Sequence, residues 1–282
     1  MYWLRILERQ PEGLLLVENL YDVGKTKVKR VEALIESDLV YPLLRGRDVA
    51  RWRAKPSSHI VMAQDPKKRV GYTESWLRIT YPRSYAYLKE FEEVLRGRSG
   101  YHKYFDAGKD PFYSIYDVAE YTFAPYKVVW REQASGFTAA VAAAQDKAFV
   151  PDHKLMLVEC SDLEEAHYLC SALNCSVSRL LVRSYVVETQ MSTHVLQHLA
   201  IPAFSAENHV HKSLALLSQR ASELAALGKE KDTELHQVEE QIDSLAAKLW
   251  GINSNELVEI KKSLQTGGKN VFQDSELPAV GK

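Results

Sequence analysis

The stretch YPLLRGRDVARW, residues 41–52, contains three arginines around a single glycine and has an aromatic residue at each end. Two more cations follow it, so five basic residues fall within eleven positions: Arg45, Arg47, Arg51, Arg53 and Lys55. An ordinary basic turn, the phosphate-binding loop of an enzyme and an element that reads nucleic acid can all have this composition. The remaining sequence has to separate these three interpretations.

The composition is typical of a soluble globular protein. The 282 residues are 46% hydrophobic and 26% charged, and a chain of this length can bury a substantial core. No apolar run approaches the roughly 20 residues of a membrane span, and the N-terminal residues do not resemble a secretory signal. Three cysteines are too few for a disulfide framework. We therefore expect a cytoplasmic protein without membrane contact.

The net charge of −1 hides an uneven distribution along the chain. Residues 1–131 contain 23 Lys and Arg against 17 Asp and Glu, whereas residues 132–282 contain 13 against 20. A basic half suits a protein that meets a polyanion. A surplus of this size is equally ordinary for a segment of this length, so charge alone does not choose between the two interpretations.

Hydrophobic periodicity predicts an α+β fold in which a β-rich core has flanking helices and is followed by a helical hairpin. Apolar runs predict strands at 59–63, 127–130, 136–143 and 154–159. Apolar residues three or four positions apart predict helices at 26–39, 84–96 and 162–186, the last with Asp162 as N-cap and Glu165 as its capping-box partner. Residues 210–250 predict two helices broken at Gly228, and a short helix follows before an aperiodic tail.

Motifs for catalysis are missing from the sequence. It contains no P-loop, no dinucleotide-binding glycine motif and no nucleophile elbow. His194 and His198 have a spacing that suits a metal, but no third ligand is evident. A nuclease would need Asp152 close to Glu259 and Lys261, which lie more than a hundred positions away. We therefore expect no catalytic, metal-binding or cofactor-binding residues in this chain.

Four stretches in register resemble a known family. YPLLRGRDVARW is similar to the start of the specificity region in adenine-specific DNA methyltransferases of restriction–modification and phage-defence systems, which include the type IIG enzymes, the BREX-type methyltransferases and the TaqI-like C-terminal specificity domain. YPRSYAYLKEFEEVL with FYSIYDVAEYTFAPYKVVWRE, then HYLCSALNCSVSRLLV, and finally EEQIDSLAAKLWGINSNELVEI look like the segments that follow in these bacterial enzymes. The matches cover roughly residues 35–262.

The resemblance implies a target-recognition module without the methyltransferase core. The family's catalytic domain carries a glycine-rich cofactor loop and an N-P-P-Y-like catalytic loop, and neither occurs here, since the chain has no Pro-Pro pair. The implied partners are double-stranded DNA and a methyltransferase domain or subunit that uses S-adenosylmethionine. The implied arrangement is an N-terminal segment (1–25), a DNA target-recognition domain (26–208), a helical pair that acts as spacer or partner surface (209–265) and a flexible tail (266–282).

The expected DNA-binding residues are cations, because duplex DNA is held through its phosphates. They are Arg45, Arg47, Arg51, Arg53, Lys55, Lys67, Lys68, Arg69, Lys127 and Arg131. Arg47 and Asp48 have an alternative role as a local ion pair that holds a turn, and the turn at 67–69 has one as a solvated loop. Two further alternatives for the chain are a nuclease with an unrecognised metal site and a protein-binding subunit of a defence complex.

Overall fold

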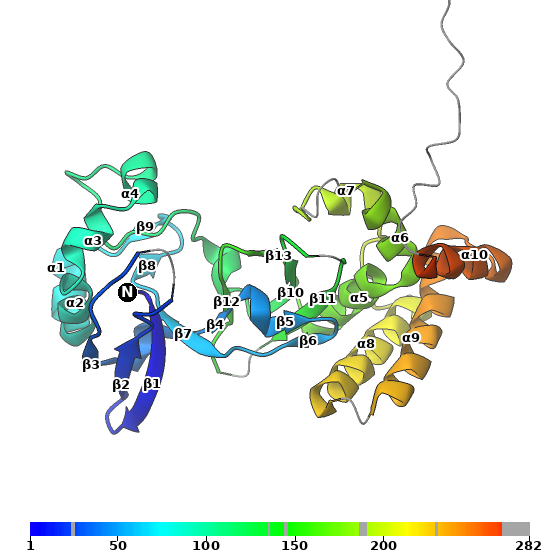
Figure 1. Ribbon diagram of the computed structural model, residues 1–282, viewed down its shortest axis with the longest axis horizontal. Helices are drawn as coiled ribbons and strands as arrows, with labels where there is room; N and C mark the ends of the chain where they lie inside the picture. The colour runs from blue at the N-terminus through cyan, green and yellow to red at the C-terminus, as the bar shows by residue number, and fades with distance from the viewer. Residues whose placement is uncertain (24–25, 135, 144–145, 186–190, 229–230, 267–282) are drawn as a thin grey trace, which may run out of the picture.

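Two β-sheets run through the middle of the molecule, and helices lie at both ends (Figure 1). The computed structural model describes residues 1–23, 26–134, 136–143, 146–185, 191–228 and 231–266. Helices and strands are both abundant and the sheets are open, which confirms the α+β class predicted from the sequence.

The first sheet has six strands in the order β12-β4-β7-β1-β2-β3. Its neighbours are antiparallel except β12 and β4, which are parallel. The strands are β1 (Trp3–Gln10), β2 (Leu14–Asn19), β3 (Glu32–Glu36), β4 (Val40–Leu44), β7 (Ser58–Val61) and β12 (Val150–Pro151). The 3₁₀ helix η1 (Ser37–Leu39) joins β3 to β4. Strands from the expected N-terminal segment thus pair with strands of the expected recognition domain.

A helical cover buries one face of this sheet. Leu4, Val17 and Ile35 are inaccessible to solvent and pack with Tyr87 and Phe91 of the helical segment. Burial of such side chains contributes roughly 1.5–3 kcal/mol each. The helices are α1 (Glu74–Thr80), α2 (Pro82–Lys89), α3 (Glu92–Arg96) and α4 (Ser99–Tyr104), and the small hairpin β8 (Gln64–Asp65) and β9 (Val70–Gly71) precedes them.

The second sheet has three antiparallel strands in the order β11-β10-β13. They are β10 (Tyr126–Arg131), β11 (Ala139–Ala143) and β13 (Leu155–Glu159), with the 3₁₀ helix η3 (Glu120–Phe123) before them. A two-stranded ribbon, β5 (Val49–Ala50) and β6 (Arg53–Ala54), packs against β10 and β11. The basic stretch of residues 45–55 is therefore attached to the second sheet, although the strand before it belongs to the first.

The C-terminal helices form the second large core. Trp52, Trp130, Tyr168, Leu214 and Ile242 are buried together there. The helices are α5 (Leu163–Asn174), α6 (Ser176–Tyr185), α7 (Val195–Leu199), α8 (His209–Leu227), α9 (Asp232–Ala246), the 3₁₀ helix η5 (Ala247–Trp250) and α10 (Ser254–Gln265). Helices α8 and α9 form the predicted hairpin, and α8 ends at Gly228, whose φ of 97° suits glycine.

Several local predictions are confirmed. A strand overlaps each of the four predicted runs, as β7, β10, β11 and β13. Asp162 caps α5 by accepting a hydrogen bond from the Glu165 main-chain N–H at 2.8 Å. The predicted reciprocal capping box is not formed, because the Glu165 carboxylate accepts from the N–H of Ser161, one residue before the N-cap, at 2.6 Å.

The helix predicted at 26–39 is wrong. Residues 32–36 form β3, in which Ile35 lies opposite Leu15 of β2. Two other predicted helices are divided. The one at 84–96 breaks between Lys89 and Glu92, and the one at 162–186 breaks at Cys175, whose backbone is extended. Most of the predicted tail, residues 267–282, lies outside the described residues.

Candidate nucleic-acid interface

The basic stretch forms a rigid turn followed by the β5–β6 ribbon, near the middle of the molecule (Figure 1). The turn is the 3₁₀ helix η2 (Gly46–Asp48). The Asp48 carboxylate accepts a hydrogen bond from the Arg45 N–H at 2.9 Å, and the Asp48 carbonyl accepts one from the Lys55 N–H at 3.0 Å. Asp48 therefore holds the turn through the main chain.

Arg47 contributes little to the geometry of that turn. Its Nε lies 4.0 Å from the Asp48 carboxylate, and 64% of its side chain is exposed. Arg53 and Lys55 are also exposed, and among the described residues neither of them pairs with a carboxylate. These three cations, Arg47, Arg53 and Lys55, are named the ribbon cations below. Arg47 has only the long contact with Asp48, and Arg53 and Lys55 pair with no carboxylate of the described residues, so the three charges remain available to a phosphate.

Arg51 and Trp52 instead attach the ribbon to the C-terminal helices. The Arg51 guanidinium lies 3.1 Å from the Glu239 carboxylate of α9 and donates to the Asn174 carbonyl at 2.9 Å. Trp52, only 2% exposed, donates its indole N–H to the same Glu239 carboxylate at 2.6 Å. Burial is the main influence on the pKa of Arg51 and lowers it, while Glu239 acts in the opposite direction. Arg51 is thus held by closer internal partners than any of the ribbon cations.

Asn174 fixes the same region from the other side. Its side-chain amide exchanges two hydrogen bonds with the main chain of Ala139, each 2.9 Å long. The main-chain N–H of Trp52 donates to the Ala139 carbonyl at 3.1 Å. Trp52 has a φ of 66°, which is rare for a bulky residue. These contacts define a ribbon anchor made of Arg51, Trp52, Asn174 and Glu239.

Arg45 lies at the start of the turn and is half-buried. Its guanidinium stacks over the Trp3 ring, with 4.6 Å to the ring centroid. It also influences Asp152, whose pKa is raised chiefly by burial and lowered in part by the neighbouring Arg45. A guanidinium on an aromatic face contributes about 0.5–2 kcal/mol, so Arg45 joins the turn to strand β1.

The second basic turn, Lys67 to Arg69, joins β8 to β9 in the N-terminal part of the molecule. The Asp65 carboxylate accepts from the Lys67 and Lys68 N–H groups at 3.0 and 3.1 Å, which shapes the turn. Arg69 pairs with Asp117 at 2.6 Å, and both side chains are about half exposed. All three cations face solvent, but they belong to a hairpin separate from the β5–β6 ribbon.

The surface position expected for Lys127 is wrong. The residue is fully buried, and its ammonium donates to the carbonyls of Ala124 and Phe149. Burial lowers its pKa to about 8. Arg131, at the end of the same strand, donates to the Val49 carbonyl through two nitrogens at 3.0 and 2.6 Å. Both cations tie neighbouring segments together within the protein.

One basic neighbour of the turn was missed from the sequence. Lys154 is exposed, and its Cβ lies 3.9 Å from the position that a Cβ on Gly46 would take. His153 beside it is exposed as well. These residues adjoin η2 because strand β12 pairs with β4, which brings segments a hundred positions apart together. The sequence signal was only the turn PDHK between two strands.

Histidine and cysteine side chains, whose chemistry can support catalysis, were located where the chain is described. No group of three or more His, Cys, Asp or Glu side chains that could hold a metal occurs among these residues. His198 stacks on Tyr185 with 4.5 Å between ring centroids. Cys170 and Cys175 are fully buried, and burial raises the pKa of their thiols to about 12 and 11. None of the described helices is long and apolar enough to cross a membrane.

Comparison with solved structures shows where this fold occurs elsewhere. It is similar to the Type IIL restriction-modification enzyme MmeI, whose structure was determined in complex with DNA, with a TM-score of 0.55 and 10% sequence identity. The similarity covers 81% of this chain and 30% of the MmeI chain, so the chain spans about a third of that enzyme. At this identity the comparison demonstrates a shared fold. No family model and no curated protein matches the sequence.

Proposed function

We propose that the chain recognises a target sequence in double-stranded DNA as part of a restriction–modification system. The observation that carries this proposal is the fold shared, over most of the chain, with a restriction-modification enzyme solved with DNA. The ribbon cations support it, because Arg47, Arg53 and Lys55 are exposed on the η2 turn, on β6 and just after β6, in a segment that the anchor residues hold in place. A rigid basic element is suited to positioning a duplex.

The finer proposal is that the chain serves an adenine-specific methyltransferase. It would hold the duplex while a separate domain or subunit, which binds S-adenosylmethionine, flips out the adenine and methylates it. The sequence resemblance supports this part of the proposal, and the exposed face of the helical pair α8–α9 provides a surface for such a partner.

The test is the salt dependence of DNA binding by the purified chain. Each phosphate contact contributes about 0.9 to the slope of log Kobs against log salt. Replacing all three ribbon cations by glutamine should therefore reduce the slope by about 2.7. Between about 50 and 200 mM salt the native chain should then lose roughly 40-fold more affinity than the variant does. Fluorescence anisotropy with a labelled duplex measures the affinity at each salt concentration, and therefore the slope, for the native chain and the variant.

A matched control keeps the change of charge but moves it elsewhere. Arg78, Lys212 and Lys248 are exposed cations on helices, and their triple glutamine variant should keep the native slope. Equal slopes for both variants would contradict the role of the ribbon. A native chain that does not bind DNA at all, at concentrations up to about 10⁻⁴ M, would favour a protein-binding subunit. Divalent-ion-dependent cleavage of the duplex would favour the nuclease.

A further inference from the structure

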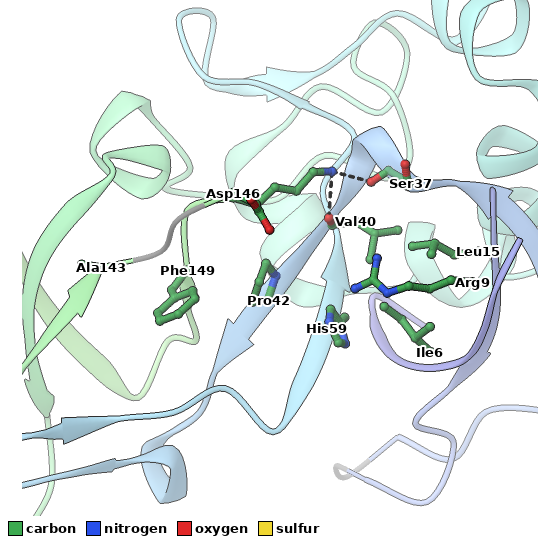
Figure 2. A pocket seen from close by; sticks show the side chains of 11 residues that line it. Ile6, Arg9, Leu15, Ser37, Val40, Pro42, His59, Ala143, Asp146 and Phe149 are labelled. Carbon is green, nitrogen blue, oxygen red and sulfur yellow. Dashed lines mark hydrogen bonds between the residues drawn. The ribbon is translucent and has the colours of Figure 1, made fainter. Parts of the chain in front are cut away.

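A cavity of about 460 Å³ opens beside the first sheet (Figure 2). Its walls come from β1, β2, β4 and β7 on one side and from residues around Phe149 on the other. Its lining residues Pro42 and His59 lie on either side of the ribbon cations in the sequence, and Lys55 shortly precedes β7, the strand that supplies His59 to the wall. The cavity and the basic ribbon are therefore joined by a short stretch of chain.

Two of the basic groups in this cavity have no internal partner. Arg9 is exposed at the end of β1, and His59 is half-buried on β7. Among the described residues neither side chain makes an ion pair or a hydrogen bond. Figure 2 shows the Arg9 guanidinium and the His59 ring side by side. Burial is the larger cause that lowers the pKa of His59, and the charge of Arg9 adds to it.

The third basic group, Lys147, shapes the wall instead of facing the cavity freely. Its ammonium donates to the main-chain carbonyls of Ser37 and Val40, the latter at 3.1 Å (Figure 2), and to that of Asp38 at 3.0 Å. This positive charge stays in place because three acceptors hold it. Asp146 is the one carboxylate among the residues lining the cavity, and it is exposed at the rim.

The rest of the wall is apolar. Leu15, Val40 and Phe149 line it together with the ring of Pro42. A cavity with two unpartnered donors on one side and hydrocarbon on the other is complementary to an anion that carries an apolar neighbour. A phosphate group attached to a sugar has this character, whereas a bare apolar ligand would leave Arg9 and His59 without acceptors.

We propose that this cavity binds a phosphate group of the DNA backbone through Arg9 and His59, with the adjoining sugar against the apolar wall. The inference rests on the proposed function, since it extends the contact of the duplex from the ribbon cations to strand β1. It assigns Arg9 a contact that no sequence motif indicated.

The experiment replaces Arg9 by glutamine in the full chain and repeats the salt titration with labelled duplex. One lost phosphate contact should lower the slope by about 0.9, which corresponds to about 8-fold weaker binding at about 0.1 M salt. Arg5→Gln is the matched control. Arg5 lies on the same strand, is 63% exposed and pairs with Glu18, which Arg30 continues to hold. R5Q should bind as the native chain does, and both variants should keep the native thermal midpoint.

A second measurement separates this inference from the proposed function. Inorganic phosphate and thymidine 5′-monophosphate are titrated while the His59 ring resonances are followed by NMR. Shifts in the native chain that vanish in R9Q support the phosphate site even if the duplex does not bind. If duplex binding is salt-dependent but equal in R9Q and the native chain, the backbone contact is overturned while DNA recognition stands. Tight binding of the free nucleotide with such unchanged duplex affinity would make the cavity a nucleotide site instead.

Discussion

Replacing Glu239 by alanine should destabilise the protein strongly, because one carboxylate serves two partners in the ribbon anchor. It holds the Arg51 guanidinium at 3.1 Å and the Trp52 indole N–H at 2.6 Å. The side chains of Arg51 and Glu239 are only 25% and 17% exposed. Removing one partner of a buried pair costs about 3–5 kcal/mol, and partial exposure places this pair near 3.

The second partner adds to that cost. Trp52 is buried, so its indole N–H would lose an acceptor without gaining water, at about 1 kcal/mol or more. Together the free energy of unfolding should fall by about 4 kcal/mol in E239A. E239Q keeps an oxygen that accepts from the indole and loses only the charge, so its loss should be about 2 kcal/mol.

Urea unfolding followed by tryptophan fluorescence measures these losses. Glu240→Ala is the control on the next position, where the carboxylate is 51% exposed and pairs with Lys261 at the surface. Exposed pairs contribute about 1 kcal/mol at most, so E240A should stay close to the native chain. A loss in E239A below 1 kcal/mol, or equal to that of E240A, would refute the reasoning that the ribbon is anchored through Glu239.

Two further predictions concern the cores. His167 is buried, and burial lowers the pKa of its imidazole to about 4 in the folded protein. In the unfolded chain the same imidazole has a pKa near 6.5. As the pH falls, the unfolded state therefore takes up a proton before the folded state does. Its contribution to stability is complete above pH 6.5 and is lost on acidification toward pH 4, by about 2 kcal/mol between pH 7 and 5. Chemical unfolding should show that the free energy of unfolding of H167Q falls by about 2 kcal/mol less than that of the native chain over the same pH interval. Equal losses in H167Q and the native chain would contradict the role of His167 in this pH dependence. Gly71→Ala should cost about 1–3 kcal/mol, because its Cβ would lie 2.9 Å from the buried Tyr113 ring and 3.0 Å from Ser114 Oγ. Gly100→Ala is the control, because a Cβ added at Gly100 has no atom within 4 Å. If thermal melts show that Gly100→Ala is less stable than Gly71→Ala, the clash with Tyr113 and Ser114 is not the cause of the destabilisation.

Local chemistry made part of the fold predictable. The Asp162 cap and the end of α8 at Gly228 depend on residues within a few positions, so the sequence displays their whole mechanism. The strand β3 depends on residues that are distant in the sequence. Leu34 and Ile35 fit a helical stripe as well as a strand, and the pairing of Ile35 with Leu15, twenty positions away, decides between them.

The candidate site was predictable in composition but not in role. Arg47, Arg53 and Lys55 are exposed as their charge suggested. Arg51 stands among them in the sequence, yet Glu239, nearly two hundred positions away, engages its guanidinium. Lys127 lies in an apolar strand, and its burial follows from two carbonyls that only the folded chain brings to it. Periodicity carries no information on such distant partners.

The parallel strand β12 has a consequence for synthesis of the chain. Strand β4 pairs with β7 on one side and with β12 on the other, and β12 is made some ninety residues after β7. At about 5–20 residues per second, a ribosome needs roughly 5–20 s to cover that distance. During this interval the β4 edge is open to other nascent chains. Once β12 docks, Pro151 forms part of the new edge and lacks the N–H that a further strand would need.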